Sequence, residues 1–168
     1  YKRQPMDIRL ASTAAKFGFV FSRRGIVPEA ASSWFLPRLV GISQAMEWVA
    51  SGEVFPAEEA MAGGLVRSVH KPDDLLPAAY ALARRLTESS SAVSIAVARK
   101  MMWRMLGADH PMAAHKVDSR GILERGRSED VKEGINSFFE KRAPQFPDKV
   151  SDGLGTIFSD WHDPTYDS

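Results

Sequence analysis

The sequence contains no cysteine among its 168 residues. This absence excludes a disulfide framework, a thiolate nucleophile and any zinc site that uses sulfur ligands. Histidine does not supply a metal site instead, because the four histidines are too widely spaced for one element and form no His-Glu zincin spacing. We therefore predict no bound metal and expect the histidines at the surface or in helix caps.

Long apolar runs are also missing. No stretch approaches the roughly 20 residues that a membrane span needs, and the N-terminal residues lack the basic-then-apolar layout of a signal peptide. The C-terminal residues, Tyr166 to Ser168, match neither the peroxisomal nor the endoplasmic-reticulum address. We predict a soluble intracellular protein of the cytoplasm, with the mitochondrion and the peroxisome as alternatives.

A strong excess of charge is absent as well, since the formal net charge is +1 with 26% charged residues. This balance points to neither a nucleic acid nor a membrane surface as a partner, so any anionic ligand must be held by a local patch. The sequence also has no Gly-x-Ser-x-Gly elbow, the most readable element of a hydrolase triad. Hydrophobic residues make up 44% of the chain, enough for a sizeable core.

The first part of the chain mixes strand and helix patterns. Period-two alternation and aromatic or β-branched runs predict strands at residues 7–12, 16–21 and 65–69. Helical spacing between glycine and proline stops predicts helices at residues 30–40, 42–51, 56–62 and 72–88. This order indicates a mixed α/β fold.

From Ser89 onward every apolar pattern is helical. Residues 110–125 supply a further helix, and Ser128 is predicted to cap the next one. After Arg142, prolines with scattered glycine and aspartate predict an irregular tail, either wrapped on the surface or disordered. We therefore divide the chain into a core part at 1–88, a helical region at 89–143 and an irregular tail at 144–168.

The segment best suited to carry chemistry joins the second predicted strand to the next helix, and Glu29 is its only carboxylate. Partial desolvation beside the aromatic strand would raise the pKa of Glu29 toward the range useful for moving a proton next to a carbonyl. The alternative is a solvent-facing carboxylate at a helix start. Arg23 and Arg24 could meet a phosphate or a carboxylate, but at most one of two strand neighbours faces a given ligand.

Basic residues also bracket the last predicted helix. Lys132, Lys141 and Arg142 lie close in sequence to Phe138, a layout that could hold a phosphate beside an aromatic ring. The alternative is a set of solvated basic side chains on an exposed helix end.

Several motifs occur in the order and spacing of one known family. They are DIRLAS at residues 7–12, KFGF at 16–19, RGIVP at 24–28, LVG at 39–41, AEEA at 57–60 after Gly52, GGLV at 63–66, and EG at 133–134 leading to FFEKR at 138–142. Together they make residues 5–147 resemble the enoyl-CoA hydratase/isomerase (crotonase) family. The resemblance implies an α-rich α/β fold, in which part of a ClpP-like spiral of ββα units precedes a helical trimerisation region. It also implies an acyl-CoA thioester as substrate, no separate cofactor, and self-association as a trimer or a dimer of trimers.

Members of this family stabilise an enolate with two backbone N–H groups and use one or two glutamates to move protons or add water. In the alignment that the resemblance implies, the first glutamate falls at about Tyr1 and the second at Phe21, and this chain contains neither N–H donor. We therefore expect the C-terminal half of such an enzyme, and poor catalysis from this part by itself. Glu29, across the turn from Phe21, is the nearest replacement carboxylate.

The resemblance also suggests contacts to the substrate. Relatives use a lysine of the C-terminal helix to approach the CoA nucleotide, and Lys141 matches that position, with Phe138 one helical turn before it. The predicted site residues are Glu29 as the catalytic group and Phe21, Arg24, Phe138 and Lys141 as substrate contacts.

An enoyl-CoA hydratase or isomerase is the leading hypothesis, and a single carboxylate suits isomerisation better than two-carboxylate water addition. Two alternatives remain. One is a non-catalytic or truncated crotonase-like subunit that lacks the oxyanion hole, and the other is a different acyl-CoA reaction, such as thioester hydrolysis, on the same scaffold.

Overall fold

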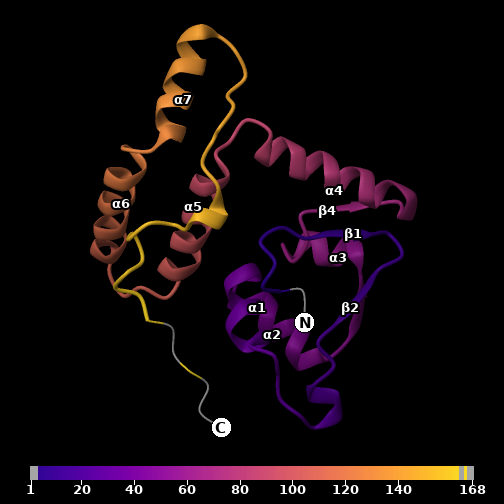
Figure 1. Ribbon diagram of the computed structural model, residues 1–168. Helices are drawn as coiled ribbons and strands as arrows, with labels where there is room; N and C mark the ends of the chain where they lie inside the picture. Colours follow the sequence, from indigo (N-terminus) through magenta and orange to yellow (C-terminus); the bar gives the residue numbers. More distant parts are fainter. Residues whose placement is uncertain (1–3, 163–164, 166–168) are drawn as a thin grey trace. The chain divides into compact units, whose positions relative to one another are not determined.

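The computed structural model of this chain describes residues 4–162 and residue 165 (Figure 1). The chain divides into two compact units, Tyr1–Leu82 and Ala83–Ser168, and the division falls within helix α4 (Pro72–Thr87). Helices dominate both units, and the strands that the structure describes all lie in the first.

The first unit contains two short sheets. Strand β1 (Leu10–Ser12) pairs in parallel with β4 (Ser68–His70), and β2 (Lys16–Gly18) pairs antiparallel with β3 (Val54–Pro56). The remaining elements of this unit before α4 are the 3-10 helix η1 (Ser22–Arg24), α1 (Ser32–Val40), α2 (Ile42–Ser51) and α3 (Ala57–Ala62).

Stacked aromatic rings form the core of the first unit. The centroid of the buried Trp48 ring lies 4.4 Å from that of Phe55 and 6.2 Å from that of Phe19. The Trp48 indole N–H donates to Glu59 at 2.8 Å, which satisfies its buried donor. A Cβ added at Gly63 would lie 2.5 Å from the Trp48 ring, so close packing there requires glycine.

The strands differ from the sequence prediction in length and number. The predicted strand at 16–21 ends at Gly18. Gly18 pairs with Val54, the first residue of β3, and the chain before Val54 leaves the extended conformation at Gly52, whose φ is 58°. Strand β3 itself was not predicted, because Pro56 was interpreted only as a helix start, whereas it ends the strand and caps α3.

The other two strand predictions were too long at one end. The predicted strand at 7–12 begins only at Leu10. The strand predicted at 65–69 is observed as Ser68–His70, because the amides of Leu65 and Val66 donate to the Ala60 carbonyl at the end of α3.

The second unit is helical, as predicted from residue 89 onward. Its elements after α4 are α5 (Ala92–Met105), α6 (Pro111–Arg125), α7 (Glu129–Glu140) and the 3-10 helix η2 (Val150–Asp152). Side chains of Ser91, His110 and Ser128 accept hydrogen bonds from the first turns of α5, α6 and α7. The cap predicted at Ser128 is confirmed, and His110 is a capping histidine.

The chain after α7 is irregular apart from η2, but it is packed. Ile157 and Phe158 are buried with Val93, Val97 and Val117 in the core of this unit. Residues 150–162 are therefore packed into the core of this unit rather than only wrapped on its surface, and residues 163–164 and 166–168 of the predicted tail lie outside the described residues.

Candidate functional site

The 3-10 turn η1 is fastened to the end of α2. The Ser22 hydroxyl donates to the Val49 carbonyl at 2.6 Å, and Arg23 Nε donates to the Ser51 carbonyl at 2.6 Å. The Arg23 guanidinium also pairs with Glu53 at 2.9 Å. These contacts fix the backbone from which the segment carrying Glu29 departs.

The two adjacent arginines have different surroundings. Arg23 is used to hold the turn, whereas Arg24 is exposed next to Gly25, which adopts the left-handed conformation. Within the described residues no hydrogen bond or ion pair of the Arg24 side chain is present. An anion could therefore pair with Arg24 without displacing a protein contact.

Phe21 lies beneath the turn rather than on its surface. Its side chain belongs to the hydrophobic core of the first unit and is 7% exposed. The backbone carbonyl of Phe21 accepts hydrogen bonds from the amides of Arg24, at 2.9 Å, and Ile26, at 3.2 Å. The ring therefore offers little surface to a ligand, and its predicted role as a substrate contact stays a prediction.

Glu29 is exposed at the start of the segment that enters α1. Glu29 follows η1 and precedes α1, and its exposure matches the solvent-facing alternative rather than a carboxylate packed beside the aromatic strand. Two apolar side chains just before it, Ile26 and Val27, are also exposed, at 57% and 78%. A carboxylate next to exposed apolar groups can face a ligand that has both an acidic C–H and an apolar chain.

Ser32, which the sequence did not single out as a site residue, holds the backbone of Glu29. Its hydroxyl donates to the Glu29 carbonyl at 2.7 Å and its amide donates to the same oxygen at 3.0 Å. The intervening Ala30 and Ala31 have φ of 51° and 56°, a conformation that costs a non-glycine residue roughly 1–2 kcal/mol. A serine shortly after a candidate catalytic residue and at the first position of a helix is the sequence signal that could have identified it.

The end of α7 brings Phe138 and Lys141 together, as their spacing predicted. The Lys141 amide donates to the Phe138 carbonyl at 3.3 Å, and Lys141 adopts the left-handed conformation with φ of 54°. Both side chains are exposed, and the Phe138 ring packs edge-on against Phe139 with centroids 5.8 Å apart. An ammonium group and a ring face are thus accessible at one helix end.

Arg142 closes this helix end with ion pairs. It contacts the two carboxylate oxygens of Glu133 at 2.6 and 2.8 Å and Glu140 at 2.6 Å, and the Gln145 amide donates to Glu133 at 2.6 Å. The hydrogen bond from Arg142, followed by that from Gln145, lowers the pKa of Glu133 to about 2. The same carboxylates raise the pKa of Arg142. Arg142 is therefore occupied by ion pairs within the protein, and Lys141 is the cation of the two that is more available to bind an anionic ligand.

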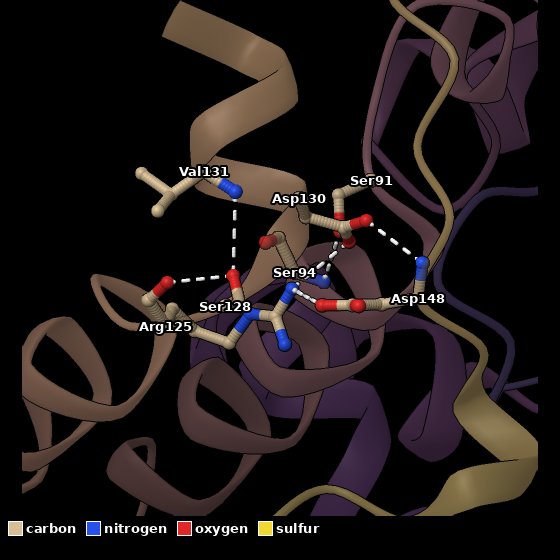
Figure 2. Close-up of polar contacts among 7 residues, drawn as sticks. All are labelled: Ser91, Ser94, Arg125, Ser128, Asp130, Val131 and Asp148. Carbon is tan, nitrogen blue, oxygen red and sulfur yellow. Dashed lines mark hydrogen bonds and ion pairs between the residues drawn. The ribbon is translucent and has the colours of Figure 1, made fainter.

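A second polar cluster joins the helices of the second unit (Figure 2). Asp130 is 3% exposed and accepts from the Ser91 hydroxyl, from Arg125 at 2.9 Å and from the Asp148 amide at 2.9 Å. Arg125 also pairs with the Asp148 carboxylate at 2.9 Å. The cluster connects the starts of α5 and α7, the end of α6 and the chain that follows α7.

A cavity of about 480 Å³ adjoins this cluster. Its apolar lining includes Ile122, Val131, Ile135 and Phe146. The charge of the Arg125 guanidinium at its wall is already met by Asp130 and Asp148. Arg125 is therefore not available to bind a phosphate in this cavity.

The part of the chain that the structure describes contains neither a metal-binding group of side chains nor a membrane-spanning helix. In that part, no group of three or more acidic or histidine side chains is arranged to hold a metal ion. No helix there is both long enough and apolar enough to cross a membrane. Tyr1, the position to which the resemblance assigns the first glutamate, lies outside the described residues.

Sequence comparison identifies relatives over most of the chain. Residues 5–149 match the model of the enoyl-CoA hydratase/isomerase family. Enoyl-CoA hydratase ACTT3 of Alternaria alternata is 39% identical over 152 residues, which are 90% of this chain and 51% of that protein. The 1,2-epoxyphenylacetyl-CoA isomerase of Escherichia coli K12 is 32% identical over 150 residues, 85% of this chain and 54% of that one. The chain thus spans about half the length of the curated relatives it matches.

Solved structures agree with this result. The crystal structure of an enoyl-CoA hydratase from Bacillus anthracis superposes with a TM-score of 0.78 at 26% identity, over 83% of this chain and 54% of that one. An enoyl-CoA hydratase/isomerase from Mycobacterium abscessus ATCC 19977 gives 0.77 at 32% identity, over 86% and 59%. The predicted fold class, a partial and α-rich α/β crotonase fold, is confirmed. This chain belongs to the enoyl-CoA hydratase/isomerase family.

Proposed function

We propose that this chain takes part in acyl-CoA processing as a segment of a hydratase or isomerase enzyme, with Glu29 as the group that moves the proton. The observation that supports this most directly is the exposed Glu29 carboxylate beside the exposed Ile26 and Val27 side chains. A thioester substrate has a matching pair of features, an acidic C–H next to its carbonyl and an apolar acyl chain.

Isomerisation is the reaction that one carboxylate performs most simply. Glu29 removes a proton from the carbon next to the carbonyl or from its vinylogous position, which leaves an enolate or dienolate. It then delivers a proton to another carbon, so the double bond moves and the atoms balance, and the proton on the carboxyl group can exchange with solvent between the two steps. Water addition by two carboxylates is the second form of the proposal, since relatives of this chain include both hydratases and an isomerase.

Two exposed cations are available for the phosphates of CoA. Arg24 lies beside η1 in the first unit, and Lys141 lies at the end of α7 in the second, next to the exposed Phe138 ring. In the proposal each cation is a separate candidate for a phosphate contact, Lys141 beside Phe138 in the second unit and Arg24 in the first. Self-association as a trimer belongs to the same proposal, and sedimentation velocity measures it.

The proposal is tested by replacing Glu29 with glutamine in the polypeptide that contains this chain. We expect turnover of enoyl-CoA substrates to fall about 100-fold or more, the range that a positioned acid or base contributes. The matched control is Glu58→Gln, an exposed carboxylate of α3, which should leave turnover unchanged. Equal turnover of the Glu29 variant and the wild type would show that Glu29 does not carry the proton.

A non-catalytic subunit is the second candidate, and the burial of Phe21 favours it. The resemblance assigns the second glutamate of the family to this position, yet Phe21 is a core residue here. Calorimetric titration with an acyl-CoA separates the two functions. A protein that assembles into trimers but binds no acyl-CoA would support the non-catalytic function.

A further inference from the structure

Residues 150–162 lie beyond the span that matches the family, which ends at residue 149. They nevertheless supply a large part of the core of the second unit. Ile157 is 1% exposed and Phe158 is buried, and Leu154 and Trp161 pack against the same cluster. We call residues 150–162 the strap.

The strap lies against α5 and α6. Its apolar side chains meet Val93, Val97 and Met101 of α5 and Val117 of α6. We call the surface formed by these residues the α5–α6 groove. The strap itself folds into successive turns, in which the Ser159 amide donates to the Thr156 carbonyl and the Trp161 amide to the Phe158 carbonyl.

Leu154, Ile157, Phe158 and Trp161, the residues of the strap that reach the core, follow a recognisable spacing. They stand at positions i, i+3, i+4 and i+7, the anchor spacing of amphipathic helices that bind in hydrophobic grooves, although residues 154–161 form turns here. The Phe158 and Trp161 rings also contact each other, with centroids 4.6 Å apart. The pattern therefore resembles a docked ligand peptide more than a simple chain end.

Charges on the helices complement the strap. Arg120 of α6 pairs with Asp160 at 2.6 Å and donates to the Ile157 carbonyl at 3.3 Å. Lys100 and Arg104 of α5 lie over the Phe158 and Trp161 rings, 4.6 and 5.5 Å from their centroids. The groove thus presents cations where the strap presents aromatic faces and a carboxylate.

The connection to α7 leaves the strap free to act as a separate piece. Residues 143–149 form no helix or strand, and no strand ladder ties the strap to α5 or α6. The strap is held by its buried apolar side chains, by a hydrogen bond from the Thr156 amide to Glu124, and by hydrogen bonds from Arg120 and Arg104 to the Ile157 and His162 carbonyls. It can therefore leave and rejoin the groove without breaking a helix or a sheet.

We infer that the α5–α6 groove is a docking site for a short amphipathic segment with aromatic anchors, and that the strap of this chain is its occupant. While docked, the strap closes the groove to any other segment of the same chemistry. Release of the strap opens the groove, which then binds the same sequence in trans.

A fluorescently labelled peptide of residues 150–162 tests this inference by anisotropy. Ile157→Asp in the full chain removes the central anchor and should release the strap, so the peptide should bind this variant. Binding to the wild type should be at least about tenfold weaker, because apparent affinity falls with the fraction of open grooves. A peptide that itself carries Ile157→Asp is the control and should bind neither protein.

A second variant makes the test independent of the core substitution. Asp160→Arg places a cation opposite Arg120 and leaves the apolar anchors intact, so it should also increase peptide binding over the wild type. Circular dichroism establishes which variants are folded, and if Ile157→Asp is not, Asp160→Arg decides. Absence of peptide binding to the folded variants would overturn the inference, as would equally tight binding to the wild type.

Discussion

Ala30 and Ala31 are the residues at which local strain is most evident. Both follow Glu29 and both have positive φ, which favours glycine. The hydrogen bonds from the buried Ser32 to the Glu29 carbonyl hold this conformation. The direction in which the Glu29 carboxylate leaves the chain thus depends on a strained turn and on one hydroxyl group.

Replacing Ala31 with glycine should therefore stabilise the protein. The removed strain of roughly 1–2 kcal/mol exceeds the entropic cost of glycine, about 0.5–1 kcal/mol, so we expect the free energy of unfolding to rise by about 0.5–1 kcal/mol. Urea denaturation measures the change. Ala98→Gly, at an exposed site inside α5, is the control and should lower stability by about 1 kcal/mol. A loss of the same size at both positions would contradict the assigned backbone conformation.

The residues of the candidate site were proposed from the sequence on different grounds. Glu29 was proposed because it is the only carboxylate of its segment, and Lys141 because the family resemblance implies a lysine there, with Phe138 one helical turn before it. Of the two alternatives for Glu29, the solvent-facing one is observed, and it arises where the chain leaves η1, whose position the hydrogen bonds of Ser22 and Arg23 fix. Those bonds join residues far apart in the sequence, and local patterns do not contain them.

At the scale of elements, helices were predicted better than strands. Helix signals are local, because caps such as Ser128 and stops such as Gly52 act on their own segment. Strand length depends on a partner elsewhere in the chain, and β2 ends where β3 leaves the ladder. A strand of three residues that ends in Pro56 carries too little alternation to be recognised without its partner.

The closing contacts of α7 predict a pH dependence at that helix end. The pKa of Glu133 is lowered from its usual 4.5 to about 2 by Arg142 and Gln145. A lowered pKa means that the charged form is favoured in the folded state, so this contribution is complete above about pH 4.5 and is lost as the pH falls toward 2. Protection of the last turn of α7 against hydrogen exchange, relative to the intrinsic exchange rate at each pH, should fall across that interval.

Two variants separate this effect from general acid denaturation. In Glu133→Gln the acid-dependent step at the end of α7 should disappear, because the carboxylate whose pKa is lowered is no longer present. Glu129→Gln removes an exposed partner of Lys132 at the other end of the helix and should retain the step. If the acid-dependent loss of protection at the end of α7 persists in Glu133→Gln, groups other than Glu133 cause the pH dependence.

At the scale of the molecule, the two units have separate cores. The first is built on stacked aromatic rings, and the second on valines together with residues of the strap. The Asp130 cluster links the ends of several elements within the second unit (Figure 2). Loss of this cluster should therefore act on one unit more than on the other.

Asp130→Ala tests this separation. It removes a buried acceptor from Ser91, Arg125 and the Asp148 amide, and we expect a loss of about 3 kcal/mol, the range for breaking a buried ion pair. Hydrogen exchange followed by mass spectrometry should show lost protection in α5, α6 and α7, with β2 and β3 unchanged. Equal loss of protection in both units would contradict independent cores.

The central claim concerns proton transfer at Glu29, and solvent isotope exchange measures it most directly. In heavy water, a carboxylate that removes and returns a proton introduces deuterium into the acyl chain, and mass spectrometry of the recovered acyl-CoA detects it. For the polypeptide that contains this chain, we predict deuterium incorporation in the wild type and in Glu58→Gln. Incorporation should fall about 100-fold or more in Glu29→Gln. Undiminished incorporation in Glu29→Gln would contradict the account.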